Sequence, residues 1–334
     1  MLERTLAKSS LLSFPLGQTV VVRHEKERRA PGFIADRVVP AAGPCAVVCK
    51  EDGSRVLLGG GGAAAGWLHR VPAHAAEEFM TVPLAEAVYV GEDVVHSRNV
   101  FVVGEKEVQD EYVRRCEWVP PMSVFPSLCA TDQSLLSLAL SMKLWAVTTA
   151  FCARCGGAMK SLDHGMTRDC TTCKHRIYPT VMPAMIVAVL DGKGNVILSL
   201  RHRHRTCPKG RPMRTVLSGF VAQGESMEET VVREVMEETG ATVTSLRYVG
   251  SQPWPAPFEL MTCYYAVADN SPVITAQEDE LISVHWVSKE DVRLALAGEN
   301  PEFSVVHGFS AANVLLSKWA NGEVDDWGRP ATPS

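Results

Sequence analysis

The sequence has no apolar run close to the ~18 residues that a membrane-spanning helix needs, so we expect no membrane insertion. It also has no excess of positive charge, because 33 Lys and Arg stand against 38 Asp and Glu, a net charge of −5. A net negative chain argues against nucleic-acid binding over the whole surface and leaves only a local basic patch open. With these two classes excluded, we expect a globular protein. A chain of 334 residues with 46% hydrophobic content is long enough for two or three domains.

Cysteine is too sparse for a disulfide scaffold, with ten residues in the whole chain. We therefore expect an intracellular, reducing compartment. Residues 1–16 carry Arg4 and Lys8 among serines and leucines, as mitochondrial presequences do, but Glu3 and a poor amphipathic period argue against targeting. The expected location is the cytoplasm, with the mitochondrion as the alternative.

Four of the cysteines form two Cys-x-x-Cys pairs. Cys152 and Cys155 make the first pair, and Cys170 and Cys173 make the second, after residues 156–169. Each pair can present two thiolates from one tight turn, and two such turns complete a tetrahedral Cys₄ zinc site. Because four protein ligands leave no position for water, we expect a structural Zn²⁺. A redox Cys-x-x-Cys is the alternative, which two pairs together disfavour.

Residues 219–240 combine a Gly-rich turn, an amphipathic helix and a glycine stop. Ser226 and Glu229 form a capping box, and Gly240 suits the left-handed position after the last helical turn. The apolar residues that recur at helical spacing, and that we expect to face a core, are Val231, Val232, Val235 and Met236.

The same helix carries a dense group of acidic residues. Glu234 and Glu238 are four residues apart and point the same way, with Glu237 beside them. Arg233 can fix the carboxylate of Glu237 while the others stay free. Carboxylates this close repel one another unless a cation lies among them, and Mg²⁺ or Mn²⁺ suits oxygen ligands. The alternative is a solvated acidic helix face.

A basic stretch precedes this helix. Residues 201–214 carry five arginines and one lysine, and no acidic residue lies between Asp191 and Glu225. Such a stretch can receive phosphate oxygens, although a solvated loop is the alternative.

The pattern of the whole chain predicts an α+β protein. The expected domains are an N-terminal β-rich domain (1–128), a connecting helix (129–150), a zinc ribbon (151–178), a C-terminal α/β domain (179–322) and a polar tail (323–334). In the first domain we expect strands at 19–23, 45–50, 55–58, 87–90 and 100–103, a turn at 51–54 and a flexible loop at 59–66. A buried helix is expected at 134–145. In the C-terminal domain we expect strands at 185–190, 196–200, 260–267 and 283–287, a proline-fixed turn with an exposed tryptophan at 248–257, and a helix at 309–319.

Gly219, then five residues, Glu225, then seven residues and Arg-Glu-Val-x-Glu-Glu-x-Gly resembles the Nudix box. A Cys₄ ribbon, this box and Ser251-Gln-Pro-Trp-Pro, in this order, resemble the NADH pyrophosphatase branch of the Nudix hydrolases over about residues 130–320. The resemblance implies a homodimer with a Nudix α/β/α sandwich, catalytic Mg²⁺ or Mn²⁺ and structural Zn²⁺. The implied substrate is a dinucleotide, NAD(H), cleaved to nicotinamide mononucleotide and AMP, and some members remove NAD caps from RNA 5′ ends.

The resemblance also assigns residues. The implied metal ligands are Glu234, Glu237, Glu238, Glu280 and the main-chain carbonyl of Ser218. Either Glu237 or Glu238 would orient or deprotonate the attacking water, next to Arg233. The implied substrate contacts are Phe220, Tyr178 (reaching across the dimer), Ala312 and, in the motif after the box, Gln252 and Trp254.

The sequence departs from the family pattern where the substrate would bind. Ala256 and Glu259 replace a phenylalanine and a serine, and Arg214 replaces a tyrosine. Loss of an aromatic stacking contact costs roughly 1 kcal/mol, while Arg214 would add a phosphate partner. The alternative is that Arg214 pairs with Glu259. The altered pocket leaves ADP-ribose, dinucleoside polyphosphates and capped RNA open as substrates, and a non-catalytic RNA-binding module is the remaining alternative.

Overall fold

The computed structural model describes residues 21–30, 33, 44–58, 69–70, 79–83, 87–93, 98–202, 210–255, 258–269, 273–277, 279–306 and 308–331. The chain forms two compact units. The N-terminal unit contains Gln18–Val181 and Trp254–Phe258, and the C-terminal unit contains Met182–Pro253 and Glu259–Ser334. No helix among these described residues is long and apolar enough to cross a membrane.

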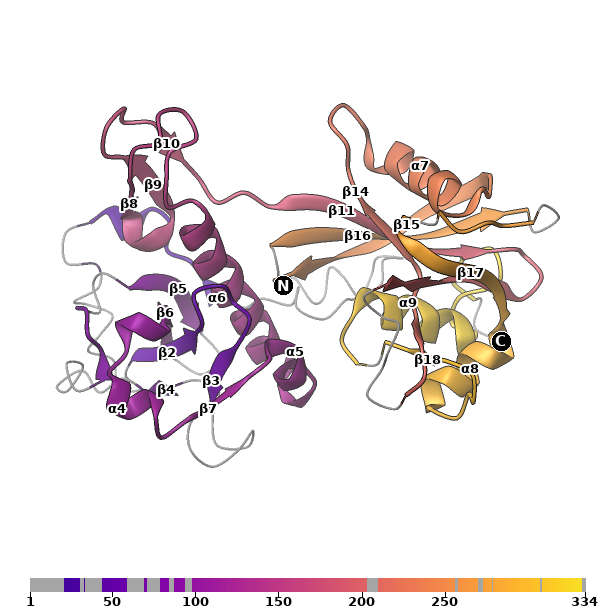
Figure 1. The fold of residues 1–334 in the computed structure, drawn as a ribbon, viewed down its shortest axis with the longest axis horizontal. Coiled ribbons are helices and arrows are strands. Elements are labelled where there is room, and N and C mark those ends of the chain that lie inside the picture. Colours follow the sequence, from indigo (N-terminus) through magenta and orange to yellow (C-terminus); the bar gives the residue numbers. More distant parts are fainter. Residues whose placement is uncertain are drawn as a thin grey trace. The chain divides into compact units, whose positions relative to one another are not determined.

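The N-terminal unit is built on one mixed sheet, as expected for a β-rich domain (Figure 1). Its strand order is β1-β5-β6-β2-β3-β7, with β4 paired to β2. The strands are β1 (Val21–Val22), β2 (Pro44–Cys49), β3 (Val56–Leu58), β4 (His69–Arg70), β5 (Val88–Asp93), β6 (Arg98–Gly104) and β7 (Glu117–Val119). The turn between β2 and β3 is confirmed, with Gly53 at φ +68°. The predicted loop at 59–66 and the N-terminal residues 1–16 lie outside the described residues.

The predicted buried helix is confirmed and is longer than its apolar run, since α6 spans Ala130–Thr148. It contacts β2, β5 and β6 and buries Leu135, Leu136 and Trp145. The shorter helical segments of this unit are η1 (Glu27–Arg29), η4 (Glu105–Glu107), α4 (Asp110–Val113), α5 (Pro121–Val124), η5 (Phe125–Ser127) and η6 (Asp163–Gly165). A small antiparallel sheet follows, in the order β10-β9-β8, from β8 (Met159–Leu162), β9 (Thr167–Cys170) and β10 (Arg176–Ile177). Of the paired cysteines, Cys170 lies in this sheet, at the end of β9.

The C-terminal unit has a second mixed sheet, in the order β15-β16-β11-β12-β17, with β14 paired to β11. Its strands are β11 (Met182–Leu190), β12 (Asn195–Arg201), β14 (Leu217–Phe220), β15 (Val243–Trp254), β16 (Glu259–Ala268) and β17 (Leu281–Ser288), and β13 (Met213–Arg214) pairs separately with β18 (Ser304–Val305). The apolar run at 185–190 lies in β11, between β16 and β12. Met185 and Val187 enter one core and Ile186 and Ala188 the other, which is why this strand is apolar at every position.

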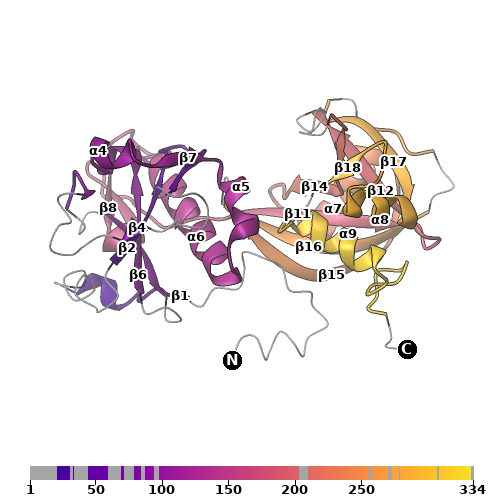
Figure 2. The same ribbon diagram turned by 90° about the horizontal axis from the view of Figure 1, so that it is seen from below.

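Helices cover both faces of this sheet. In Figure 1, α7 (Met227–Thr239) lies over one face, and α8 (Lys289–Ala297) and α9 (Ala311–Ala320) lie on the other. The view from below shows α8 and α9 together on their face (Figure 2). Sequence reasoning missed α8, although its signals are present: Ser288 accepts a hydrogen bond from the Asp291 N–H, and Gly298 ends the helix at φ +78°.

The predicted turn at 248–257 is wrong for most of its length, because β15 continues as a strand to Trp254. β15 is the edge strand of its sheet, where the N–H that Pro253 lacks is not needed for pairing. Trp254 is half-buried instead of exposed. Residues 256 and 257 lie outside the described part of the chain, and with them the substitution at Ala256.

The expectation that four apolar residues of α7 face a core holds for two. Val231 and Val235 are fully buried, whereas Val232 and Met236 are 46% and 43% exposed. Each residue advances ~100° around a helix, so the buried line through Val231 and Val235 continues to Glu238. That geometry carries a carboxylate into the interior.

Candidate active site and zinc centre

Local signals set where α7 begins and ends. The Glu229 N–H donates to Ser226 Oγ at 3.2 Å, and the Ser226 N–H donates to Glu229 Oε2 at 2.8 Å, the two halves of the predicted capping box. Gly240 ends the helix at φ +71°. The acidic residues from Glu234 onward therefore lie in the last turns of the helix, beside β14.

The approach of β14 to α7 requires glycine at position 219. A Cβ on Gly219 would lie within 2.5 Å of the carboxylate carbon and both oxygens of Glu234. The carboxylate thus rests directly against the strand backbone. The first glycine of the box is needed for this space, since Gly219 has no left-handed backbone conformation.

Arg233 joins several carboxylates instead of the single one predicted. It binds Glu225 through two hydrogen bonds, from Nε at 2.6 Å and Nη2 at 2.9 Å. Its Nη1 donates to Glu234 at 3.0 Å and to Glu237 at 2.9 Å, and Nη2 also donates to the Phe220 carbonyl oxygen at 3.0 Å. This guanidinium holds the pKa of Glu225 down to about 2. The fork therefore fixes α7, β14 and the loop between them as one unit.

Burial has the opposite effect on two other glutamates. Glu238 is completely buried, and removal from water, together with the nearby carboxylates of Glu234 and Glu280, raises its pKa to about 7 against the effect of Arg201. Burial also raises the pKa of Glu234, with Arg233 acting against it. A group of buried carboxylates with raised pKa values is typical of a site that receives a cation.

Arg201, at the end of β12, lies inside this group. Its Nη2 donates to the Ser218 carbonyl oxygen at 2.7 Å and to Glu238 Oε1 at 2.6 Å. Its Nη1 is 3.9 Å from Glu280 Oε2. The predictions placed Arg201 only in a basic stretch, because nothing in the sequence shows that β12 ends beside β14 and α7.

These oxygens suit a hard divalent cation. They comprise carboxylates and one main-chain carbonyl, the donors that Mg²⁺ and Mn²⁺ prefer. Within the described residues, Glu238 Oε2 is buried without a hydrogen-bond partner, so an acceptor is available inside the group. The cation that meets Ser218 and Glu238 in this structure is a guanidinium.

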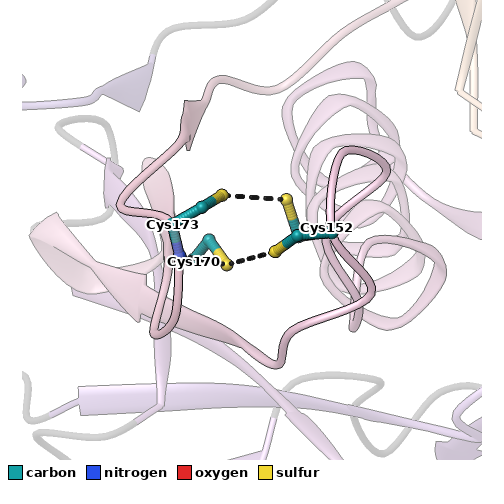
Figure 3. A group of neighbouring side chains, drawn as sticks. Cys152, Cys170 and Cys173 are labelled. Atoms are coloured by element: carbon teal, nitrogen blue, oxygen red, sulfur yellow. Dashed lines mark hydrogen bonds between the residues drawn. The ribbon is translucent and has the colours of Figure 1, made fainter.

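The four predicted zinc ligands come together in the N-terminal unit. All four sulfurs lie within 4.8 Å of one another. The Sγ atoms of Cys152 and Cys173 are 3.7 Å apart, and those of Cys155 and Cys170 are 3.5 Å apart, close to the ~3.8 Å edge of a tetrahedron with Zn–S bonds of about 2.3 Å. Figure 3 shows the sulfurs turned toward one another. The Cys173 N–H donates to Cys170 Sγ and lowers the pKa of that thiol to about 6, which favours the thiolate that zinc binds.

Two aromatic residues assigned to the substrate are open to solvent. Phe220, at the end of β14, and Tyr178, after the ribbon, each expose more than half of their side chains. Glu259 begins β16 and is half-buried.

Two further residues assigned to the substrate, Gln252 and Ala312, are buried in the C-terminal unit. Gln252 is fully buried, its Nε2 donates to the Phe309 carbonyl oxygen at 2.7 Å, and its Oε1 accepts from the Ala311 N–H at 2.8 Å, which anchors the start of α9. Ala312 is buried in the core under α9.

Arg214 lies on the α8–α9 side of the sheet. Its guanidinium carbon is 5.8 Å from the centre of the Phe303 ring, whose side chain belongs to the core of that side. The acidic residue beside it is Glu302, and the two line a cavity of about 450 Å³ with His285 and Asn300. Sequence reasoning had no signal for Glu302.

Residues 180–308 match the NUDIX domain, and residues 148–178 match the NADH pyrophosphatase zinc ribbon domain. The chain is 31% identical over 302 residues to the NAD-capped RNA hydrolase NudC of Mycobacterium bovis, covering 87% of this chain and 92% of that protein. The protein of the same name from Haemophilus influenzae is 34% identical over 204 residues, covering 61% of this chain and 72% of its own.

This chain therefore belongs to the Nudix hydrolases that carry an NADH pyrophosphatase zinc ribbon. Within them it is a Nudix pyrophosphatase of the NudC type.

Proposed function

We propose that the protein hydrolyses the pyrophosphate bond of NAD(H) to nicotinamide mononucleotide and AMP, and that it acts in the same way on the NAD cap of RNA 5′ ends. The observation that carries the proposal is that two arginines hold the assigned ligand oxygens together in two sets. Arg201 contacts both Ser218 and Glu238, and Arg233 contacts both Glu234 and Glu237. The relatives named NAD-capped RNA hydrolase support the substrate.

Catalytic Mg²⁺ or Mn²⁺ would be held by Glu234, Glu237, Glu238, Glu280 and the Ser218 carbonyl. When bound, such ions supply positive charge beside the pyrophosphate oxygens and make a coordinated water more acidic. Arg233 fixes the direction of Glu237, whose side chain is 51% exposed and can meet water. Glu237 or Glu238 would orient the attacking water or take its proton.

Phe220 and Tyr178 are the proposed contacts for the rings of the substrate. Both side chains are exposed and can stack on a planar base, which contributes roughly 1 kcal/mol for each ring pair. Tyr178 would act across a homodimer, so we expect a dimer in sedimentation experiments. Trp254, Glu259 and Arg214 are further proposed substrate contacts.

Incubation of purified protein with NADH and Mn²⁺ tests the activity. AMP and nicotinamide mononucleotide should form in equal amounts, and Glu238→Gln should abolish turnover while the protein stays folded. Glu228→Gln is the matched control, because Glu228 is an exposed glutamate in the first turn of the same helix. Absence of AMP from the wild-type reaction would overturn the proposal.

A substrate panel at matched concentrations tests the specificity. NADH or NAD-capped RNA should be turned over faster than ADP-ribose and dinucleoside polyphosphates. If a dinucleoside polyphosphate is turned over ten times faster than NADH, that polyphosphate and not NAD(H) is the preferred substrate. RNA binding that survives EDTA, with no nucleotide hydrolysed, would identify a binding module instead of an enzyme.

A further inference from the structure

Arg201 contacts three of the candidate metal ligands at once. Its Nη2 lies 2.7 Å from the Ser218 carbonyl oxygen and 2.6 Å from Glu238 Oε1, and its Nη1 lies 3.9 Å from Glu280 Oε2. The arginine side chain is only 13% exposed. Three of the oxygens assigned to the metal thus face one guanidinium.

We propose that Arg201 is an internal competitor of the divalent metal, which must release Ser218 and Glu238 before an ion can bind them. The inference rests on the proposed function in one respect, namely that this site binds a divalent cation. It adds that the affinity for the cation is set by a residue of this chain that is not itself a ligand.

Because the carboxylates are buried, the metal-free protein needs a positively charged side chain beside them to compensate their charge. Glu238 is fully buried, and the Glu234 side chain is only 13% exposed. Buried carboxylates without a counter-charge are strongly destabilising, and removal of one partner of a buried pair leaves the other charge uncompensated. Arg201 supplies that charge for Glu238, as Arg233 does for Glu234, so the ligands can stay close together without metal.

Arg201 does not use all of its hydrogen-bonding groups in its contact with Glu238, so a divalent ion can displace it more easily. One nitrogen, Nη2, makes both short contacts, whereas Arg201 Nε and Glu238 Oε2 are each buried without a hydrogen-bond partner in the described residues. A two-pronged pair with the carboxylate would use both oxygens. Arg201 also follows a register shift in the pairing of β12 with β17, the kind of irregularity that redirects a side chain beside a site.

Arg233 offers the contrast within the same site. It binds Glu225 through two parallel hydrogen bonds and also donates to Glu234, Glu237 and the Phe220 carbonyl. Several contacts would have to break together for this arginine to leave. We therefore assign displacement to Arg201 and a fixed role to Arg233.

The test is the affinity for Mn²⁺ in the absence of substrate, measured from the electron paramagnetic resonance signal of the free ion. Arg201→Met removes the charge and keeps an extended side chain, so the Kd for Mn²⁺ should fall about tenfold. The metal-free variant should melt at a lower temperature than wild type, and saturating Mn²⁺ should raise its Tm by more than it raises that of wild type. Arg329→Met is the matched control, because Arg329 is 63% exposed and pairs with Asp325 away from the site.

Arg201→Lys provides a second variant in case Arg201→Met does not fold without metal. A lysine keeps the charge but presents a single ammonium, which cannot replace the planar fork. The Mn²⁺ Kd of Arg201→Lys should therefore be lower than that of wild type and higher than that of Arg201→Met. If Arg201→Met does not fold, the comparison of Arg201→Lys with wild type alone tests the inference. Mn²⁺ binding by folded Arg201 variants that equals or is weaker than that of wild type would overturn the inference while leaving the proposed function intact. Wild-type protein that binds no Mn²⁺ would overturn the proposed function, and this inference with it.

Discussion

Replacement of Gly219 by alanine should remove the metal site while leaving the fold almost unchanged. The new Cβ would lie within 2.5 Å of the carboxylate carbon and both oxygens of Glu234, whereas ordinary contacts begin near 3.5 Å. The nearest carboxylate atom is 2.0 Å away, so the carboxylate must move by about 1.5 Å. A displacement of that size at a catalytic group can reduce the rate by about 10²-fold.

The stability of Gly219→Ala should change much less. The clashing atoms are the far end of a flexible side chain, so adjustment requires mainly the loss of the contact between Arg233 Nη1 and Glu234. We expect a decrease of about 1–2 kcal/mol in the free energy of unfolding, within the usual range for an overpacked position. The loss of activity should thus far exceed the loss of fold.

Three measurements test this reasoning together: kcat/KM with NADH, the Kd for Mn²⁺ and the Tm. Gly194→Ala is the control, because Gly194 has φ +93° with nothing near its Cβ position and lies in the turn after β11. Its backbone strain should lower stability by about 1–2 kcal/mol without affecting activity or metal binding. Gly219→Ala protein that keeps wild-type Mn²⁺ affinity and activity would refute the reasoning.

Two further predictions concern the zinc centre and Glu225. Cys170→Ser should lower bound zinc from about one ion per chain to none. It should also destabilise the N-terminal unit, because a closed Cys₄ site contributes folding energy. Metal analysis measures the first effect and thermal melting the second. Cys129→Ser, at an exposed cysteine outside the cluster, is the control, and zinc-free Cys170→Ser that melts like wild type would contradict the assignment. Glu225→Gln should destabilise the metal-free protein at neutral pH. Arg233 lowers the pKa of Glu225 from 4.5 to about 2, so its stabilising effect is full above about pH 4.5 and is lost as the pH falls toward 2. The difference in Tm between wild type and Glu225→Gln should shrink over that range, and a difference independent of pH would exclude this ion pair as its source.

Several features of this protein could be predicted from the sequence because they depend on neighbours along the chain. The capping box at Ser226 and the stop at Gly240 define α7 through bonds within one helical turn. Each Cys-x-x-Cys pair presents its two ligands from one turn. The apolar run in β11 reports a strand that is buried on both faces. The last turns of α7 were predicted to carry the acidic group for the same reason, since spacing along a helix determines direction.

The surroundings of those carboxylates were decided by the tertiary structure alone. Arg201 is 17 residues from Ser218 and 37 from Glu238 in the chain, and only the pairing of β12, β11 and β14 brings its guanidinium between them. The sequence assigns Gln252 to a substrate motif, and only the fold shows that its amide also holds the start of α9, through Phe309 and Ala311, 57 and 59 residues away. Val232 and Met236 have the helical spacing of core residues, but β14 and the sheet cover only the neighbouring face of α7. Spacing determines which side chains share a direction, whereas what they meet there depends on the order in which distant strands pair.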